Sequence, residues 1–209
     1  MHQKLKAICR RSANQIPYGK YLLAGLSFIC FLPVFRVEVA AFIFTRLLIH
    51  ECGHAFAAMQ CRVPVQGIYL YPTWCGECFY KKSLRIGTPT EMYITAMGPV
   101  SGILFGALLF TIALLTESNV LYASAMFGAI SELSNLIIGS DGRKIRFGIR
   151  TPNAGKVGMF SLILSVAIVT GVTIAGCSLN SGILLEPDAF LSSDLSAAIQ
   201  TVTKTLRRL

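Results

Sequence analysis

Charged residues are scarce in this sequence: Asp, Glu, Lys and Arg make up only 14% of the chain, against 54% hydrophobic residues. A soluble domain has about a quarter of its residues charged, so the composition excludes an ordinary soluble globular protein. Acidic residues are the scarcer kind, with 10 Asp and Glu against 19 Lys and Arg and a formal net charge of +9. The basic residues are scattered between apolar runs, which excludes a nucleic-acid-binding domain.

Histidine is also scarce, and several features of other protein classes are missing. The chain contains only three His, so few residues can contribute to a histidine-based site. It has no internal repeat and no low-complexity linker, which predicts a single domain over residues 1–209, with a membrane core at 18–179 and a tail at 188–209. The basic N-terminal segment leads into an apolar run without a small-residue cleavage site, so we expect a retained first span rather than a removed signal peptide.

Long apolar runs are abundant, and several approach the roughly 20 residues that an α-helix needs to cross a bilayer. They lie at Tyr18–Phe35, Val37–Met59, Met92–Thr116, Val120–Gly139 and Val157–Leu179. The predicted fold class is therefore an all-α polytopic membrane protein with about five transmembrane helices in a lipid bilayer.

Basic residues gather in three of the segments outside these runs. These are the N-terminal segment with Lys4, the loop after the second run with Lys81, and the loop after the fourth run with Arg143. With five spans, all three segments lie on one side of the membrane, which the positive-inside rule makes cytoplasmic. We therefore expect a multi-pass protein of the bacterial plasma membrane with a cytoplasmic N-terminus.

Two segments do not follow the pattern of membrane spans. Ile68–Tyr71 and Phe79–Lys81 are rich in apolar and aromatic residues, and Pro72 and Gly76 lie between them, which predicts a small membrane-associated β-hairpin. In the tail at 188–209, apolar residues recur at three- and four-residue steps with basic residues between them, which predicts an amphipathic helix. That helix could lie on the membrane surface or pack on the domain or a partner.

The central motif is His50-Glu51-Cys52-Gly53-His54, inside the second apolar run. Ionisable side chains at such a depth are costly unless they share an ion or a cavity. On a helix, positions i and i+4 lie on one face and one turn apart, so His50 and His54 can bind one ion. Glu51 then lies beside the ion, where it can take a proton from a metal-bound water. The motif predicts one catalytic Zn²⁺ ion.

Two histidines leave such a site one protein ligand short, because a catalytic zinc ion takes three protein ligands and a water. The predicted third ligand is a carboxylate at the same membrane depth. Asp141 follows the fourth run on the side at which the second run presents His50 and His54, and Glu132 lies within the fourth run. Depth favours Asp141, with Glu132 as the alternative.

Three lesser features have structural interpretations. Gly98, Gly102 and Gly106 recur every four residues, which lets another helix approach closely. Arg46 lies one turn before the first motif histidine, and we expect it to extend toward the membrane surface. Cys75 and Cys78 form the only local cysteine pair, and whether they bind a second metal stays open, because a closed zinc site needs four ligands.

Three segments resemble the site-2 protease family of intramembrane zinc metalloproteases. They are IHECGHAFAA at 49–58, AMGPVSGILFG at 96–106 and NLIIGSDGRKI at 135–145, the last similar to the family's Asn-to-Asp-Gly segment. The resemblance implies His50, His54 and Asp141 as zinc ligands and Glu51 as the catalytic acid–base. It also implies that Asn135 helps to hold the substrate. Without a PDZ or CBS domain, the chain would be a minimal member.

The predicted function is an intramembrane endopeptidase with its active site near the cytoplasmic side, acting on single-span membrane proteins or membrane-bound peptide precursors. The hairpin offers an edge to an extended substrate, with Ile68 and Leu70 as predicted contacts. Two alternatives stay open. A membrane metal-binding or metal-transport protein would not need Glu51, and a zinc hydrolase acting on lipid-linked substrates would use Glu132 as third ligand. No oligomeric state is predicted.

Overall fold

The computed structural model describes residues 2–15, 18–73, 75–80, 84–85 and 87–151, and also 155–156, 159–160, 163–164, 166–168, 170–171, 174, 191–193 and 195–197. The described part is mostly helical, with one small sheet. Its elements in chain order are α1 (His2–Gln15), α2 (Gly19–Ile29), α3 (Val37–Gln60), β1 (Val65–Tyr71), β2 (Cys75–Tyr80), α4 (Pro89–Thr116), α5 (Asn119–Ile137) and α6 (Ser140–Ile149).

Three helices of the described part, α3, α4 and α5, are long and apolar enough to cross a membrane. They contain 24, 28 and 19 residues, which at about 1.5 Å per residue is close to or above the roughly 30 Å of a bilayer's hydrocarbon core. The second, third and fourth predicted spans are therefore confirmed as helices of membrane length.

The first predicted span, Tyr18–Phe35, is not a single helix of membrane length. α2 contains only 11 residues, and the chain then passes through turns at residues 30–34. Pro33 explains the early end, because proline cannot donate a backbone hydrogen bond and disfavours helical geometry in the residue before it. The turns bring Phe31 and Phe35 against Val39 of α3 in a buried apolar cluster.

The fifth predicted span, Val157–Leu179, and the predicted amphipathic tail, 188–209, fall largely outside the described residues. The described residues thus contain three helices of membrane length rather than five.

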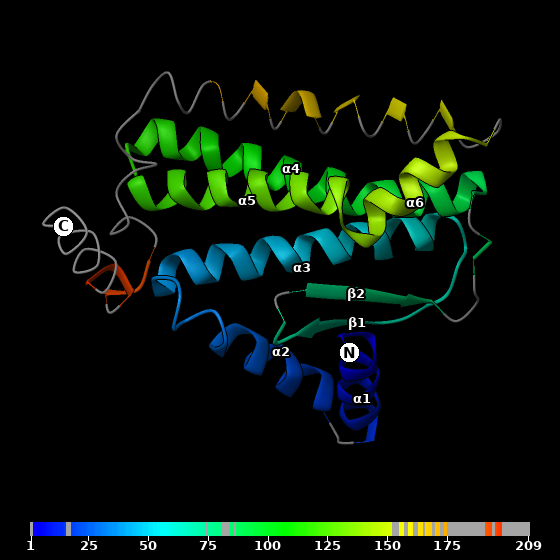
Figure 1. Cartoon of the computed structure of the whole chain (residues 1–209), viewed down its shortest axis with the longest axis horizontal. Coiled ribbons are helices and arrows are strands. Elements are labelled where there is room, and N and C mark those ends of the chain that lie inside the picture. Colours follow the sequence, from blue (N-terminus) through cyan, green and yellow to red (C-terminus); the bar gives the residue numbers. More distant parts are fainter. Residues whose placement is uncertain are drawn as a thin grey trace, which may run out of the picture.

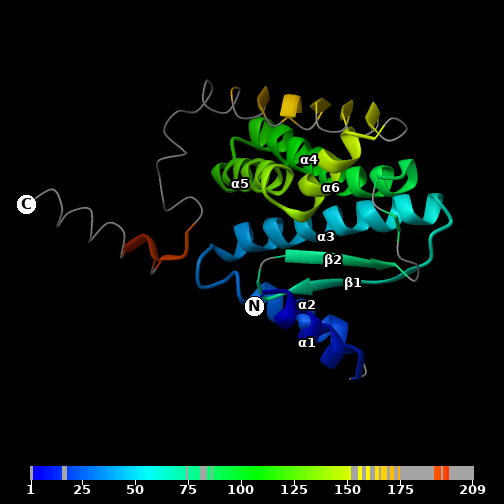
Figure 2. The same cartoon turned by 45° about the vertical axis from the view of Figure 1, so that its right-hand side comes forward.

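The three long helices lie side by side, with α4 packed against both α3 and α5 (Figures 1 and 2). α4 begins with Pro89 after the N-cap Thr88, whose side chain accepts a hydrogen bond from the backbone N–H of Glu91. Only Glu117 and Ser118 separate α4 from α5, so these two helices are antiparallel. α6 follows α5 after another short turn, which brings α6 to the end of the bundle at which α3 finishes (Figure 1).

The hairpin is confirmed, although its second strand starts earlier than predicted. β1 and β2 pair antiparallel, and Gly76, expected to break the run, is a strand residue paired with Leu70. The hairpin lies along α3, with β2 toward α3 and β1 toward α2 (Figures 1 and 2). Glycine is required at this position because of a residue on another element: a Cβ on Gly76 would lie 2.5 Å from Oε1 of Glu51 on α3.

Helix α1 was not predicted from the sequence, and it packs on the hairpin. The Arg10 guanidinium lies 3.8 Å from the centre of the Phe79 ring, a cation–π contact. Tyr69 donates a hydrogen bond from its hydroxyl to Oδ1 of Asn14 at 2.6 Å. At least one N-terminal basic residue, Arg10, therefore packs on the fold and is not simply a charge in a loop.

Candidate metal centre

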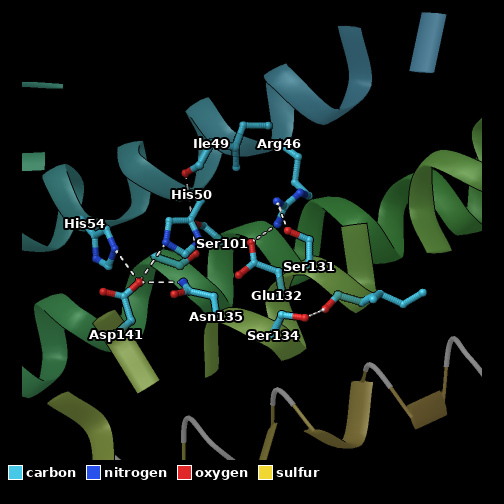
Figure 3. Close-up of polar contacts among 12 residues, drawn as sticks. Arg46, Ile49, His50, His54, Ser101, Ser131, Glu132, Ser134, Asn135 and Asp141 are labelled. Atoms are coloured by element: carbon cyan, nitrogen blue, oxygen red, sulfur yellow. Dashed lines mark hydrogen bonds and ion pairs between the residues drawn. The ribbon is translucent and has the colours of Figure 1, made fainter. Parts of the chain in front are cut away.

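Four buried side chains meet where α3, α6 and the hairpin come together. His50, Glu51 and His54 lie on α3, and Asp141 lies in the first turn of α6. Each is at most 7% exposed. Nε2 of His50 lies 3.1 Å from Oδ2 of Asp141, and Nε2 of His54 lies 3.4 Å from the same oxygen. Both imidazoles thus point at one carboxylate (Figure 3).

In the described part of the chain, His50, His54 and Asp141 are the one group of three side chains whose donor atoms could hold a metal ion, since all lie within 4.8 Å of one another. The turn between α5 and α6 places the carboxylate. Arg146 donates to the backbone carbonyls of Leu136 at 2.9 Å and Ile137 at 2.6 Å, which ties α6 to the end of α5 and satisfies helix-terminal carbonyls.

The second ring nitrogen of each histidine has its own partner. Nδ1 of His54 donates to the backbone carbonyl of Ile94 at 2.7 Å, and Nδ1 of His50 lies 3.0 Å from Oε1 of Glu132. With Nδ1–H engaged in this way, Nε2 of each ring faces Asp141: it donates to that carboxylate when it carries a proton, and without that proton it has the lone pair that could bind a metal ion. Metal-binding histidines commonly have this arrangement, because the outer hydrogen bond fixes the tautomer and the ring orientation.

Glycines of α4 make room for these side chains. A Cβ on Gly98 would collide with the His54 ring, and one on Gly102 would collide with the Glu132 carboxylate. A Cβ on Gly106, by contrast, would meet no atom within 4 Å. The glycine repeat, interpreted from the sequence as general helix packing, therefore has a specific role at its first two positions.

Glu132, the alternative third ligand, lies on the other side of the His50 ring from Asp141. Its Oε1 accepts a hydrogen bond from Nη1 of Arg46, whose Nη2 donates to Oγ of Ser131 at 2.9 Å (Figure 3). Arg46 is 7% exposed, so the expectation that it extends to the membrane surface is wrong. This ion pair was not predicted from the sequence. One sequence feature could have indicated it: Arg46 and Glu132 are both ionisable residues within apolar runs, where each needs a neighbour of opposite charge.

A cavity of about 550 Å³ opens onto the group. Its wall includes His50, Glu51, His54, Glu132, Asn135 and Asp141, together with Gly76, Glu77 and Cys78 of β2. Ile68 and Leu70, predicted as substrate contacts, lie on β1 and are not part of this wall. Asn135 is part of it, and its Nδ2 donates to Oδ2 of Asp141 at 2.9 Å. The strand that faces the site is thus β2.

Burial and neighbouring charges act on the titratable groups beside the cavity. Burial alone would raise the pKa of Asp141, but the imidazoles of His54 and His50 hold that pKa well below its usual range, so Asp141 is a carboxylate. Burial, together with the nearby Glu51 carboxylate, raises the pKa of the Cys78 thiol to about 12. Cys78 is thus a neutral thiol, and neither it nor Cys75 belongs to a three-ligand group among the described residues.

Residues 22–147 match the family model described as Peptidase M50B-like, which covers more than half of the chain and includes all of the side chains above. The chain belongs to this family of site-2 proteases. No curated protein and no solved structure matches it significantly. Membership of the site-2 protease family indicates a metallopeptidase and an integral membrane protein, in agreement with the three membrane-length helices.

The donor set fits the zinc ion that is typical of M50 metallopeptidases. Two imidazole nitrogens and one carboxylate oxygen converge from α3 and α6, and both imidazoles are oriented by outer partners. Three protein ligands beside an open cavity are what a catalytic zinc site requires, because the fourth position must admit water or substrate.

Proposed function

We propose that the chain is an intramembrane zinc endopeptidase of one membrane-embedded domain, with its site near the cytoplasmic side. His50, His54 and Asp141 hold one Zn²⁺ ion, and Glu51 is the general acid–base. The observation that supports this best is the convergence of the three donor atoms within 4.8 Å of one another, with Glu51 beside them on the same cavity wall.

The chemistry is divided between the ion and the chain. When bound, zinc lowers the pKa of a coordinated water to about 7 and polarises a carbonyl. Glu51 accepts the proton of the attacking water and delivers it to the leaving amide nitrogen. Asn135 uses one amide N–H on Asp141 and has a second N–H for a substrate carbonyl, in keeping with its place on the cavity wall.

The substrate is a single-span membrane protein or a membrane-bound peptide precursor. A helix hides its peptide bonds in its own hydrogen bonds, so the cleaved segment must bind in an extended form. β2 pairs with β1 on one edge, and among the described residues no strand pairs with its other edge. A substrate strand can therefore add to β2 beside the cavity. Ile68 and Leu70 then support β2 from β1 rather than contact the scissile bond.

The two alternatives have less support. A metal-binding or metal-transport protein has no need for a buried carboxylate such as Glu51, 5% exposed, next to the ligands on the same cavity. A hydrolase that uses Glu132 as third ligand would need that carboxylate on the Nε2 side of His50, whereas it lies at Nδ1.

Glu51→Gln tests the proposal, because glutamine has nearly the same shape but cannot accept the proton. We expect the variant to bind zinc as the unchanged chain does and to cleave a co-expressed single-span substrate about a hundred- to ten-thousandfold more slowly. Zinc per chain and cleavage are measured on the same preparation. Loss of zinc would make Glu51 a ligand, and undiminished cleavage would exclude it as the acid–base. An unchanged chain that binds zinc but cleaves none of a broad panel of membrane peptides would favour the non-enzymatic alternative.

A further inference from the structure

Arg46 and Glu132 form an ion pair inside the helix bundle. Arg46 is 7% exposed and Glu132 is 1% exposed. Arg46 comes from α3 and Glu132 from α5, 86 residues later. Each has one buried polar atom, Nε of Arg46 and Oε2 of Glu132, without a hydrogen-bond partner in the described part of the chain. Leaving such atoms unpaired is costly.

Stability is a poor explanation for this pair. The desolvation of two buried charges commonly equals or exceeds their attraction, so well-packed apolar side chains of similar size would stabilise the bundle at least as well. The backbone is nevertheless adapted to the pair. A Cβ on Gly102 would collide with Glu132, and a Cβ on Gly128 would lie 3.0 Å from Cδ of Arg46. The reason for a buried ion pair at this position must therefore lie in the residues that the pair contacts.

Its contact is His50. Oε1 of Glu132 lies 3.0 Å from Nδ1 of His50, and Arg46 holds the same oxygen, while Ser131 holds Arg46 (Figure 3). His54 differs, because its Nδ1 is held by the backbone carbonyl of Ile94. His54 is thus oriented by the backbone of α4, and His50 by a series of hydrogen-bonded side chains that joins α3 and α5.

We propose that Glu132 and Arg46 are positioning residues of the metal centre. Glu132 accepts the Nδ1–H of His50 and so directs Nε2 toward Asp141, and Arg46 fixes the Glu132 carboxylate in place. Neither residue belongs to the group of three donors that could hold the metal ion. The inference rests on the proposed metal site, but it assigns a role to two residues outside the ligand set.

Zinc affinity of the purified full-length chain, measured against a competing chelator, tests the proposal. Loss of an outer partner of a metal ligand typically weakens metal binding about ten- to a hundredfold, which is the loss expected for Glu132→Met. Glu132→Gln keeps an acceptor oxygen for Nδ1 and should lose less. The matched control is Glu91→Gln, since Glu91 is also a buried carboxylate, 3% exposed, which accepts a hydrogen bond from Thr95 but is not itself part of the cavity wall and contacts neither histidine. It should bind zinc as tightly as the unchanged chain.

A second variant removes the risk that Glu132→Met fails to fold because it leaves Arg46 unpaired. Arg46→Met with Glu132→Met removes both charges of the pair and leaves neither partner unpaired, so it should fold and still bind zinc about ten- to a hundredfold more weakly. Its Co²⁺-loaded form should show a changed visible absorption spectrum, because the His50 ring is free to turn. In a His50→Ala background, the same pair of changes should weaken the residual metal binding no further.

The outcomes separate this inference from the proposed function. An Arg46→Met, Glu132→Met variant with the zinc affinity and Co²⁺ spectrum of the unchanged chain would overturn the inference and leave the metal site standing. An equal loss in Glu91→Gln would also overturn it, since any buried carboxylate would then have the same effect. An unchanged chain that binds no zinc would overturn the proposed function itself.

Discussion

Asp141 is the residue on which the ligand assignment depends most. Among the described residues it is the one carboxylate whose oxygen lies near Nε2 of both His50 and His54, at 3.1 and 3.4 Å. It also accepts a hydrogen bond from Asn135, so its orientation is fixed from a second side. A ligand held in this way has little freedom to lose when a metal ion binds, which favours tight binding.

Asp141→Asn should weaken zinc binding and abolish most cleavage. Asparagine keeps the shape of the side chain but replaces a charged oxygen ligand with a neutral one, which attracts a divalent cation less strongly. Zinc content after dialysis and cleavage of a co-expressed single-span substrate measure the effect. If Asp141→Asn keeps full activity while Glu132→Gln loses both zinc and activity, the third ligand is Glu132 and the assignment is wrong.

Among the helices and strands, α4 acts as a template for the site. Its first-turn residues are capped by Thr88, and its glycine face admits the His54 ring and the Glu132 carboxylate. The sequence identified the glycine repeat but could not show what each glycine contacts, because that depends on which helix lies opposite. The same limit applies to Gly76, whose local pattern is that of a turn residue and whose actual neighbour is Glu51.

Gly98→Ala should reduce zinc affinity and activity strongly, whereas Gly106→Ala should not. The methyl group at Gly98 would overlap the His54 ring and displace it from its position facing Asp141, and the one at Gly106 has open space. Zinc titration of both purified variants measures the difference, and the amount of folded protein in detergent is the control for misfolding. Equal zinc affinity in the two variants would contradict the role of Gly98.

The hairpin makes a prediction through Cys78. With a pKa of about 12, roughly one Cys78 in ten thousand is ionised at pH 8, so a maleimide should modify it far more slowly in the folded chain than after unfolding in detergent. The rate should rise about tenfold per pH unit above pH 8. A variant with the other cysteines replaced allows the measurement, and fast modification of the folded chain at pH 7 would contradict the raised pKa of this half-buried thiol.

The sign of the effect on stability follows from the same pKa. An unfolded cysteine ionises near pH 8.5, so the folded state, with its higher pKa, holds the proton more firmly. The contribution of Cys78 to stability is therefore complete below about pH 8.5 and is lost as the pH rises toward 12.

For the molecule as a whole, the sequence predicted the three membrane-length helices and the local His50-to-His54 motif, because both depend on neighbouring residues. It did not predict the break after α2, where Pro33 and the packing of two phenylalanines on α3 shorten the helix. It also did not pair Arg46 with Glu132, because no local pattern relates residues on two helices 86 positions apart.

The side of the membrane on which the site lies can be tested with cysteine labels. Arg143→Cys on α6 should react with a membrane-impermeant reagent from the cytoplasmic side, and Asn119→Cys at the start of α5 from the other side, because α5 is long enough to cross. Each is placed in a chain without other cysteines. Labelling of both positions from the same side would contradict the orientation and the crossing of α5.

The distance along the chain between the metal-site residues has a consequence for folding. His50 and Asp141 are 91 residues apart, so an ion bound between them closes a loop that contains the hairpin, α4 and all of α5. Closing a loop removes conformational entropy from the unfolded chain, and this gain grows slowly with loop length, as for a disulfide. A bound ion is therefore a reversible cross-link. Metal supply would then shift the balance between the folded and the unfolded domain, because without the ion only hydrogen bonds and packing hold α6 in its place beside α3.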